Sequence, residues 1–244
     1  MHGLAAPRIR RATQNEYHHA RFEARRRVLR WLIDNVGYRV FAKFNGIENV
    51  EHLPVSGPAI IMMNHIAMID PIVVLGGLPR NVVPMARHDV FSLPLWGVFP
   101  RIWDVIPVRR GEVDRRAVQR ALAVLTAGEI VLVAPEGHRN PQLQQGKVGV
   151  AYLAARSGAP VVPAAVEGTD GYPSLRLDRS KEPGATVRLG RPFRFKVSSG
   201  RLDRDRLRQM TDEAMYILAA MLPESRRGHY SDLSHATMDT FDFA

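Results

Sequence analysis

Cysteine is absent from this sequence of 244 residues, and its absence removes several kinds of chemistry. Without cysteine the chain can form no disulfide, no thiolate metal site and no thiol nucleophile. Any nucleophilic catalysis must therefore use a different group. The absence fits a reducing, intracellular environment without requiring one.

Long apolar runs are missing as well. No segment offers the roughly eighteen consecutive apolar residues that a membrane-spanning helix needs. Residues 1–11 lack the apolar core of a secretory signal. We therefore expect neither a spanning helix nor a secretory leader.

Acidic residues are few relative to basic ones: 24 Asp and Glu stand against 34 Lys and Arg, a formal net charge of +10 at pH 7. This excess favours anionic partners, among them phosphate groups, anionic lipid headgroups, nucleic acid and an acidic carrier protein. No nucleic-acid recognition motif or aromatic stacking platform accompanies the charge, so we expect no nucleic-acid partner.

The segment 17–44 concentrates the positive charge. Its arginines are interspersed with Trp, Leu, Ile, Val and Phe, a pattern typical of one or two basic amphipathic helices. Such a helix can lie in the headgroup plane of an anionic membrane, or it can pack on its own domain with its arginines in solvent. The sequence leaves both interpretations open, and both can hold for opposite faces of the helix.

Beyond Gly46 short apolar runs alternate with helical stretches. The runs are residues 59–63, 81–86, 130–134 and 161–166, and the helical stretches are residues 113–127 and 147–157. This alternation predicts an α/β fold, with a mostly parallel central sheet flanked by helices. A strand-like run at 186–196 and a capped amphipathic helix at 203–222 complete the pattern.

The length of the chain suits one globular domain. We expect a basic helical segment for membrane association in residues 1–45, followed by a single α/β domain in residues 46–222. Apolar periodicity stops after Pro223, which predicts a mobile tail in residues 223–244.

The first apolar run leads into residues that can carry proton transfer. Asn64 and His65 follow the run, and Asp70-Pro71 is typical of a helix N-cap and first helical position. If the loop folds back, Asp70 holds one imidazole nitrogen and leaves the other to take a proton from an alcohol near neutral pH. The plainer interpretation is a helix cap beside an ordinary loop histidine.

Two other apolar runs end in charge. Residues 135–140 read Pro-Glu-Gly-His-Arg-Asn, where Gly137 allows close backbone approach and Arg139 can grip a phosphate with two hydrogen bonds. Residues 105–111 deliver Arg109 and Arg110 into a turn, which makes an anion site. A tight turn and solvated arginines are the plainer interpretations.

Taken in order, these segments resemble the glycerolipid acyltransferases, a family that includes lysophosphatidic acid and glycerol-3-phosphate acyltransferases. Its catalytic block, Asn-His-x4-Asp, is resembled by residues 64–70, and its Pro-Glu-Gly-Thr-Arg block by residues 135–139. The remaining similar blocks are the basic residue before a Pro-x-x-Gly turn at 87–97, the arginine-bearing acceptor block at 105–111 and the apolar-proline block at 161–163. The resemblance spans about residues 48–195.

The resemblance implies direct acyl transfer, in phospholipid synthesis, from acyl-CoA or acyl-carrier protein to a hydroxyl of a lysophospholipid or glycerol phosphate. His65 would be the general base and Asp70 the residue that orients it. The absence of cysteine and of a Gly-x-Ser-x-Gly elbow agrees with transfer without an acyl-enzyme. No metal and no cofactor beyond the acyl donor are implied. The residues implied to bind substrate are Asn64, Arg87, Arg109, Glu136, Gly137 and Arg139.

Three positions depart from the family pattern: His138 replaces a threonine or serine, Arg87 replaces a lysine, and Val108 stands where an acidic residue is common. These departures concern the acceptor more than the reaction. The alternatives are an acyltransferase for a glycolipid or amino-acid lipid, and a non-catalytic basic protein that binds lipid or nucleic acid. We expect a peripheral protein on the cytoplasmic face of a membrane, with an anionic surface, the acyl donor and a phosphate-bearing lipid as partners.

Overall fold

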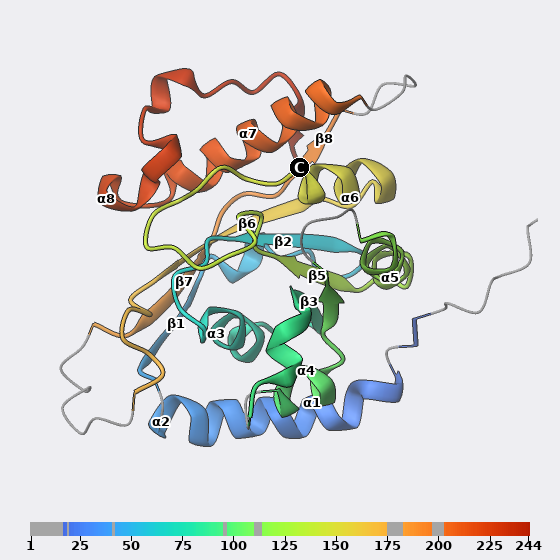
Figure 1. Ribbon diagram of the computed structural model, residues 1–244, viewed down its shortest axis with the longest axis vertical. Helices are drawn as coiled ribbons and strands as arrows, with labels where there is room; N and C mark the ends of the chain where they lie inside the picture. Colours follow the sequence, from blue (N-terminus) through green and yellow to red (C-terminus); the bar gives the residue numbers. More distant parts are fainter. Residues whose placement is uncertain are drawn as a thin grey trace, which may run out of the picture.

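The computed structural model describes residues 17–18, 20–40, 42–94, 97–109, 114–174, 183–196 and 203–244. Within these residues nine strands form one sheet, with helices on both of its faces (Figure 1). The strands are β1 (Phe44–Glu48), β2 (Ala59–Met63), β3 (Val82–Arg87), β4 (Ile106–Val108), β5 (Ile130–Val133), β6 (Val161–Glu167), β7 (Ala185–Leu189), β8 (Phe193–Phe195) and β9 (Phe241–Phe243). The α-helices are α1 (Ala20–Leu32), α2 (Tyr38–Val40), α3 (Asp70–Gly77), α4 (Val98–Trp103), α5 (Arg115–Thr126), α6 (Gly149–Ser157), α7 (Arg204–Ala220) and α8 (Glu224–Arg227).

The strand order is β1-β7-β6-β2-β5-β3-β4, with β8 and β9 continuing beside β6. Strands β2 to β6 run parallel to one another, whereas β7 and β8 pair antiparallel with β6. The predicted mostly parallel sheet is confirmed. The predicted run at 186–196 is two strands, because Gly190 and Pro192 interrupt it, yet both halves lie along β6.

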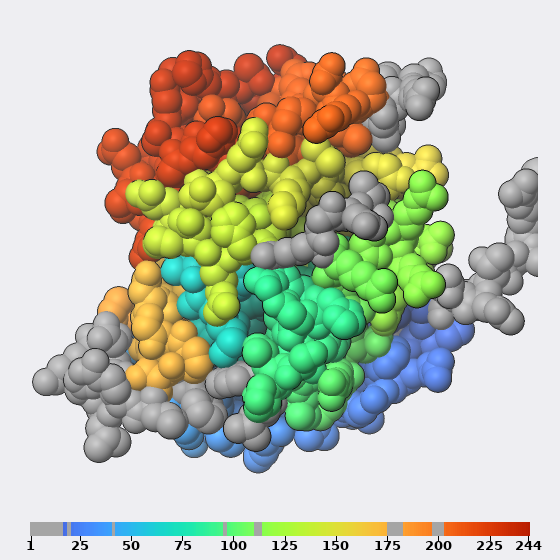
Figure 2. All heavy atoms as spheres, in the orientation of Figure 1, coloured from blue at the N-terminus to red at the C-terminus, as the bar shows by residue number. Residues whose placement is uncertain are grey.

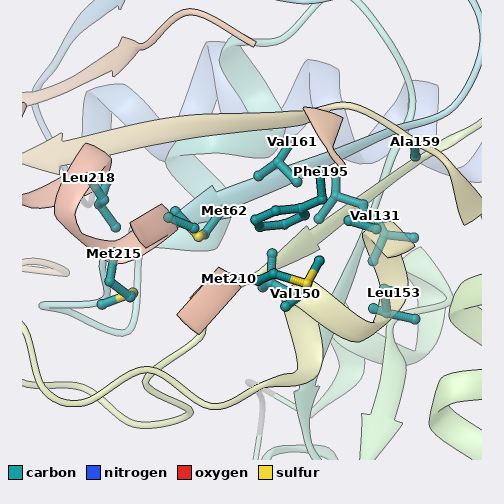
Figure 3. Close-up of a cluster of buried hydrophobic side chains, with 14 of the residues drawn as sticks. Met62, Val131, Val150, Leu153, Ala159, Val161, Phe195, Met210, Met215 and Leu218 are labelled. Carbon is teal, nitrogen blue, oxygen red and sulfur yellow. The ribbon is translucent and has the colours of Figure 1, made fainter. Parts of the chain in front are cut away.

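Two apolar clusters fill the space between the sheet and its helices. Ile60 and Met62 of β2 belong to the cluster under α5, α6 and α7, and Ile61 and Met63 to the cluster over α3 and α4. Successive residues of a strand point to opposite faces, so a central strand buried on both faces is apolar throughout. Figure 3 shows Met62 in the first cluster, surrounded by side chains of α6, α7 and β8.

The predicted N-terminal helix is present, and one of its faces packs on the domain. The buried guanidinium of Arg26 donates hydrogen bonds to the carbonyl of Trp103 at 2.8 Å and to Asn81 Oδ1 at 3.0 Å. Its charge lies 5.0 Å from the ring centroid of Phe22. A π-helical turn, Ile33–Gly37, joins α1 to α2. Residues 1–16, His19 and Phe41 of the predicted segment lie outside the described residues, and β1 already begins at Phe44, inside that segment.

The prediction of a mobile C-terminal tail is wrong. Residues 223–244 form α8, two short 3-10 turns and β9, which pairs with β8. Tyr230 and Phe241 are buried, and the carboxylate of Glu213 on α7 accepts hydrogen bonds from the backbone N–H and the hydroxyl of Thr240. These anchors are single residues at irregular spacing, so no apolar period marks them in the sequence.

Candidate active site

The predicted site residues lie at one edge of the sheet, where four neighbouring parallel strands end. His65 follows β2, Glu136 follows β5, Arg87 ends β3 and Arg109 follows β4. The strands are adjacent in that order, and Arg87 is in register with Val108, the neighbour of Arg109. Ligands of open α/β sheets bind outside the carboxyl ends of the strands, so this edge is the place to look for a substrate site.

His65 and Asp70 form the predicted hydrogen bond. His65 Nδ1 lies 3.0 Å from Asp70 Oδ2, and the same oxygen accepts the backbone N–H groups of Ile66 at 2.6 Å and Ala67 at 2.8 Å. The prediction that Asp70 is the N-cap of the following helix is wrong. Asp70 is the first residue of α3, and its buried carboxylate turns back to hold the preceding loop. The bond engages Nδ1, so Nε2 is the ring nitrogen that this bond leaves available.

Glu136 lies beneath the surface beside this pair. Its side chain is 1% exposed, and its Oε2 accepts the backbone N–H of Gln144 at 2.8 Å. Burial raises the pKa of Glu136 to about 7, and the nearby Asp70 carboxylate adds to the rise. The hydrogen bond from the N–H of Gln144 opposes it, because that bond stabilises the charged form. A carboxylate this deep fits a supporting role under the site better than a grip on a lipid headgroup.

The loop after β5 carries the next cation and is tied to the histidine loop. The N–H of Asn140 donates to the carbonyl of His65 at 2.8 Å, which fixes the backbone of exposed Arg139 close to the His65–Asp70 pair. Gly137 has a φ of +71°, a conformation that L side chains rarely adopt. A Cβ built there would lie 2.9 Å from Lys147 Nζ, so the lysine ammonium covers this glycine.

Comparison with known proteins decides the family. Residues 43–167, half of the chain, match the family model described as Acyltransferase. The chain belongs to the Acyltransferase family. It is 28% identical over 167 residues to the 1-acyl-sn-glycerol-3-phosphate acyltransferase of Bacillus subtilis, covering 68% of this chain and 82% of that protein.

One further relative and one solved structure are similar to this acyltransferase. It is 30% identical over 130 residues to the chloroplastic 1-acyl-sn-glycerol-3-phosphate acyltransferase BAT2 of Brassica napus, covering 50% of this chain but 37% of that protein. The crystal structure of the 1-acyl-sn-glycerophosphate (LPA) acyltransferase PlsC from Thermotoga maritima has the same fold. That likeness has a TM-score of 0.55 at 21% identity and covers 91% of this chain and 86% of the other.

One predicted substrate contact of the acyltransferase is revised. Asn64 is 3% exposed, and its amide bonds both backbone groups of Val166, donating to the carbonyl at 2.8 Å and accepting from the N–H at 2.7 Å. Its side chain therefore clamps the end of β2 to β6 instead of facing a substrate. This clamp fixes the backbone immediately before His65.

The three predicted arginines lie on consecutive strand ends. Arg139 follows β5, Arg87 ends β3 and Arg109 follows β4. The guanidinium of Arg87 is paired with Asp89, and the backbone N–H of Arg109 donates to Asp114 at 2.9 Å, while its side chain is exposed.

Lys147 is a cation of this site that the sequence analysis missed. It stands at the start of the helical stretch predicted from residue 147, so it was interpreted as part of a helix. In the structure α6 begins only at Gly149, and the backbone N–H of Lys147 donates to the carbonyl of Pro135 at 2.9 Å. The sequence signal that could have placed Lys147 in the loop is Gly146 directly before it, because glycine is common in loops and turns.

Proposed function

We propose that this acyltransferase transfers an acyl group from acyl-CoA or acyl-carrier protein to the free hydroxyl of a 1-acylglycerol-3-phosphate. The observation that carries the proposal is the His65–Asp70 pair at the carboxyl edge of the sheet, in a chain that has no cysteine. The names of the relatives support the choice of acceptor.

In the proposed reaction His65 Nε2 takes the proton of the acceptor hydroxyl as its oxygen attacks the thioester carbonyl. The new C–O ester bond forms, the C–S bond breaks, and the proton passes from the imidazolium to the leaving thiolate. Asp70 stabilises the imidazolium while it carries the charge and holds Nδ1–H in place. No acyl-enzyme is needed.

The acceptor's phosphate would be held by cations at the same edge. Arg139 and Lys147 come from the loop after β5, and Arg87 and Arg109 from the two strand ends beyond it. These cations favour an acceptor with a phosphate over a neutral glycolipid, because a cationic donor bonds more strongly to an anionic oxygen than to a hydroxyl. Arg87 already shares its charge with Asp89.

A membrane surface would supply that acceptor through the outer face of the N-terminal helices. Val28, Trp31, Leu32, Val36 and Val40 are exposed at helical spacing along one stripe, Trp31 by 59%. Exposed Arg21 and Arg25 continue this stripe toward the N-terminus. Such a face suits the headgroup plane of an anionic membrane on its cytoplasmic side, with the protein bound peripherally. Among the described residues no helix has the length and apolarity to cross a bilayer.

The test is a transfer assay with purified full-length protein, both donors and a panel of acceptors, read by mass spectrometry of the product. The panel contains lysophosphatidic acid, glycerol 3-phosphate, a monoacylglycerol and a lysoglycolipid. We expect a phosphatidic acid product with the parent protein and none with His65→Ala. A product from the neutral acceptors alone, or full activity in His65→Ala, would refute the proposal.

A further inference from the structure

The loop between β5 and α6, residues 134–148, carries much of the candidate site but has no helix or strand of its own. Loops of this length are uncommon in compact domains and usually functional. Backbone bonds from Gly137 to Ala134 at 3.0 Å and from Lys147 to Pro135 at 2.9 Å close its base. Its tip needs other support.

That support comes from the C-terminal segment. The N–H of Leu143 donates to the carbonyl of Arg226 at 2.8 Å, and the N–H of His229 donates to the carbonyl of Leu143 at 2.9 Å. The side chain of Arg226 also reaches the carbonyl of Pro141 at 3.1 Å. In Figure 1 this loop runs alongside α7 and α8, and Figure 2 shows it, in yellow-green, directly below the red C-terminal segment.

Gly146 is held most completely. Its N–H donates to Tyr230 Oη at 3.1 Å, and its carbonyl accepts a hydrogen bond from the Arg208 guanidinium at 2.6 Å. The Tyr230 hydroxyl in turn donates to Asp212 at 2.9 Å, and Asp212 also pairs with Arg208 at 3.0 Å. A Cβ at residue 146 would lie 2.8 Å from Met215 Cγ on α7, so only glycine allows this approach.

The same loop passes this support on to the site. Two residues before Gly146, Gln144 donates its N–H to Glu136, and earlier in the loop Asn140 donates to the carbonyl of His65. A continuous series of hydrogen bonds and loop backbone therefore runs from Tyr230 to the catalytic pair. Tyr230 lies outside residues 43–167, the part that matches the family model.

We propose that Tyr230 is a positioning residue of this enzyme, which acts with Asp212 and Arg208 through Gly146 to hold the loop in its catalytic conformation. The C-terminal segment is then part of the catalytic apparatus. The effect on turnover rests on the proposed acyl transfer, whereas the effect on the loop does not.

Tyr230→Phe in the full-length protein tests the proposal, because it removes one hydroxyl and keeps the ring. We expect amide hydrogen exchange in residues 140–147 to accelerate about tenfold, since buried donor and acceptor groups lose their partner. Exchange in β2 should stay unchanged. We expect kcat to fall by about tenfold while the KM for the acyl donor changes less than twofold, a split that general destabilisation would not give.

The matched control is Tyr216→Phe, whose ring lies 5.0 Å from that of Tyr230 and edge-on to it, and which should change neither loop exchange nor kcat. Arg208→Met removes the hydrogen bond to the carbonyl of Gly146 and should reproduce the effects on exchange and kcat. The double variant Tyr230→Phe/Arg208→Met should be less impaired than the product of the two single effects, because both act through one residue.

Unchanged exchange in residues 140–147 in both variants would overturn the proposal, as would faster exchange with unchanged kcat. If Tyr230→Phe does not fold, Arg208→Met decides; if neither folds, the network is a determinant of the fold and the positioning role is refuted. If the parent protein transfers no acyl group to any acceptor, the proposed function fails, while the exchange result still decides whether Tyr230 holds the loop.

Discussion

A single oxygen of Asp70 accepts three hydrogen bonds, from the imidazole of His65 and from two backbone N–H groups. The two backbone donors fix this oxygen before any substrate arrives, so the tautomer of the histidine is set by the fold. A carboxamide could accept the same backbone bonds. It would stabilise an imidazolium much less well.

Asp70→Asn should therefore separate catalysis from folding. We expect kcat/KM to fall by about a thousandfold, with a melting temperature close to that of the parent. Steady-state transfer assays and thermal unfolding measure the two effects. Asp242→Asn, at an exposed position on β9, is the control and should leave both unchanged. A loss below tenfold for Asp70→Asn would contradict the proposed role of this carboxylate.

Glu136 gives the fold a pH dependence whose sign can be worked out. Burial raises the pKa of its carboxyl from 4.5 to about 7. The folded state thus prefers the protonated form, so the stability from this group is complete below pH 4.5 and is lost as the pH rises through 7.

Glutamine mimics the protonated form and should escape that loss. As the pH rises from about 5 to about 8, we expect the parent to lose about 2–3 kcal/mol of unfolding free energy that Glu136→Gln keeps. Urea unfolding at the two pH values measures the difference. Exposed Glu51→Gln is the control. A difference that does not vary with pH would show that Glu136 ionises normally.

At the scale of elements, the predictability of a strand followed its burial. β2 and β6 are buried along most or all of their length and were recognised as apolar runs. β4 is short and has a central proline, yet its residues were also recognised as an apolar run that ends in charge. β1 reads Phe-Asn-Gly-Ile-Glu, which has no apolar period, and it was not predicted. Helix α4 contains Pro100 and was missed as well. β1 is placed by its pairing with β7, and α4 by its packing on α1.

One face of helix α1 packs on the domain and the opposite face is exposed, which decides how its proposed membrane role should be tested. Deleting the helix would remove Arg26 from its buried site and leave Trp103 and Asn81 without its hydrogen bonds, so truncation would destabilise the domain as well as remove the outer face. Substitutions on the outer face avoid this problem.

We expect Trp31→Ser/Leu32→Ser to weaken binding to anionic vesicles by roughly tenfold, because exposed apolar area that would enter the interface is removed. Binding of the parent should also fall with salt. Vesicle sedimentation measures both. Val55→Ser, in a side chain 95% exposed on the turn before β2, is the control and should have no effect. If the double variant sediments like the parent, α1 does not bind the membrane.

At the scale of the whole molecule, the C-terminal segment extends the sheet. Phe241 is 2% exposed, and its ring centroid lies 4.8 Å from that of Phe193 on β8. We expect Phe241→Ala to lower the unfolding free energy by about 3–4 kcal/mol, as in other buried aromatic deletions. Phe243→Ala, two residues on and 39% exposed, should cost below about 1 kcal/mol. Urea unfolding compares them, and equal losses would mean that β9 does not hold the segment.

The sequence was sufficient to predict the edge of the sheet that carries the site, because parallel strands end together and the motif residues follow apolar runs. It was not sufficient to predict which side chains support the motif residues. Asn64 was expected to meet substrate but bonds Val166, and Lys147 was assigned to a helix but covers Gly137. The first contact joins parts of the chain that are 102 residues apart, and the second depends on the path of the loop after β5. Local spacing encodes neither.

The absence of space at Gly146 restricts how this enzyme can be recombined with its relatives. A chimera cut at residue 167, where the family match ends, would join this loop to a foreign C-terminal part. The residues that replace Met215 and Tyr230 in such a chimera would face Gly146, which is fitted to these two side chains. Exchangeable units should therefore pair residues 140–147 with residues 204–230, although the two stretches are far apart in the gene.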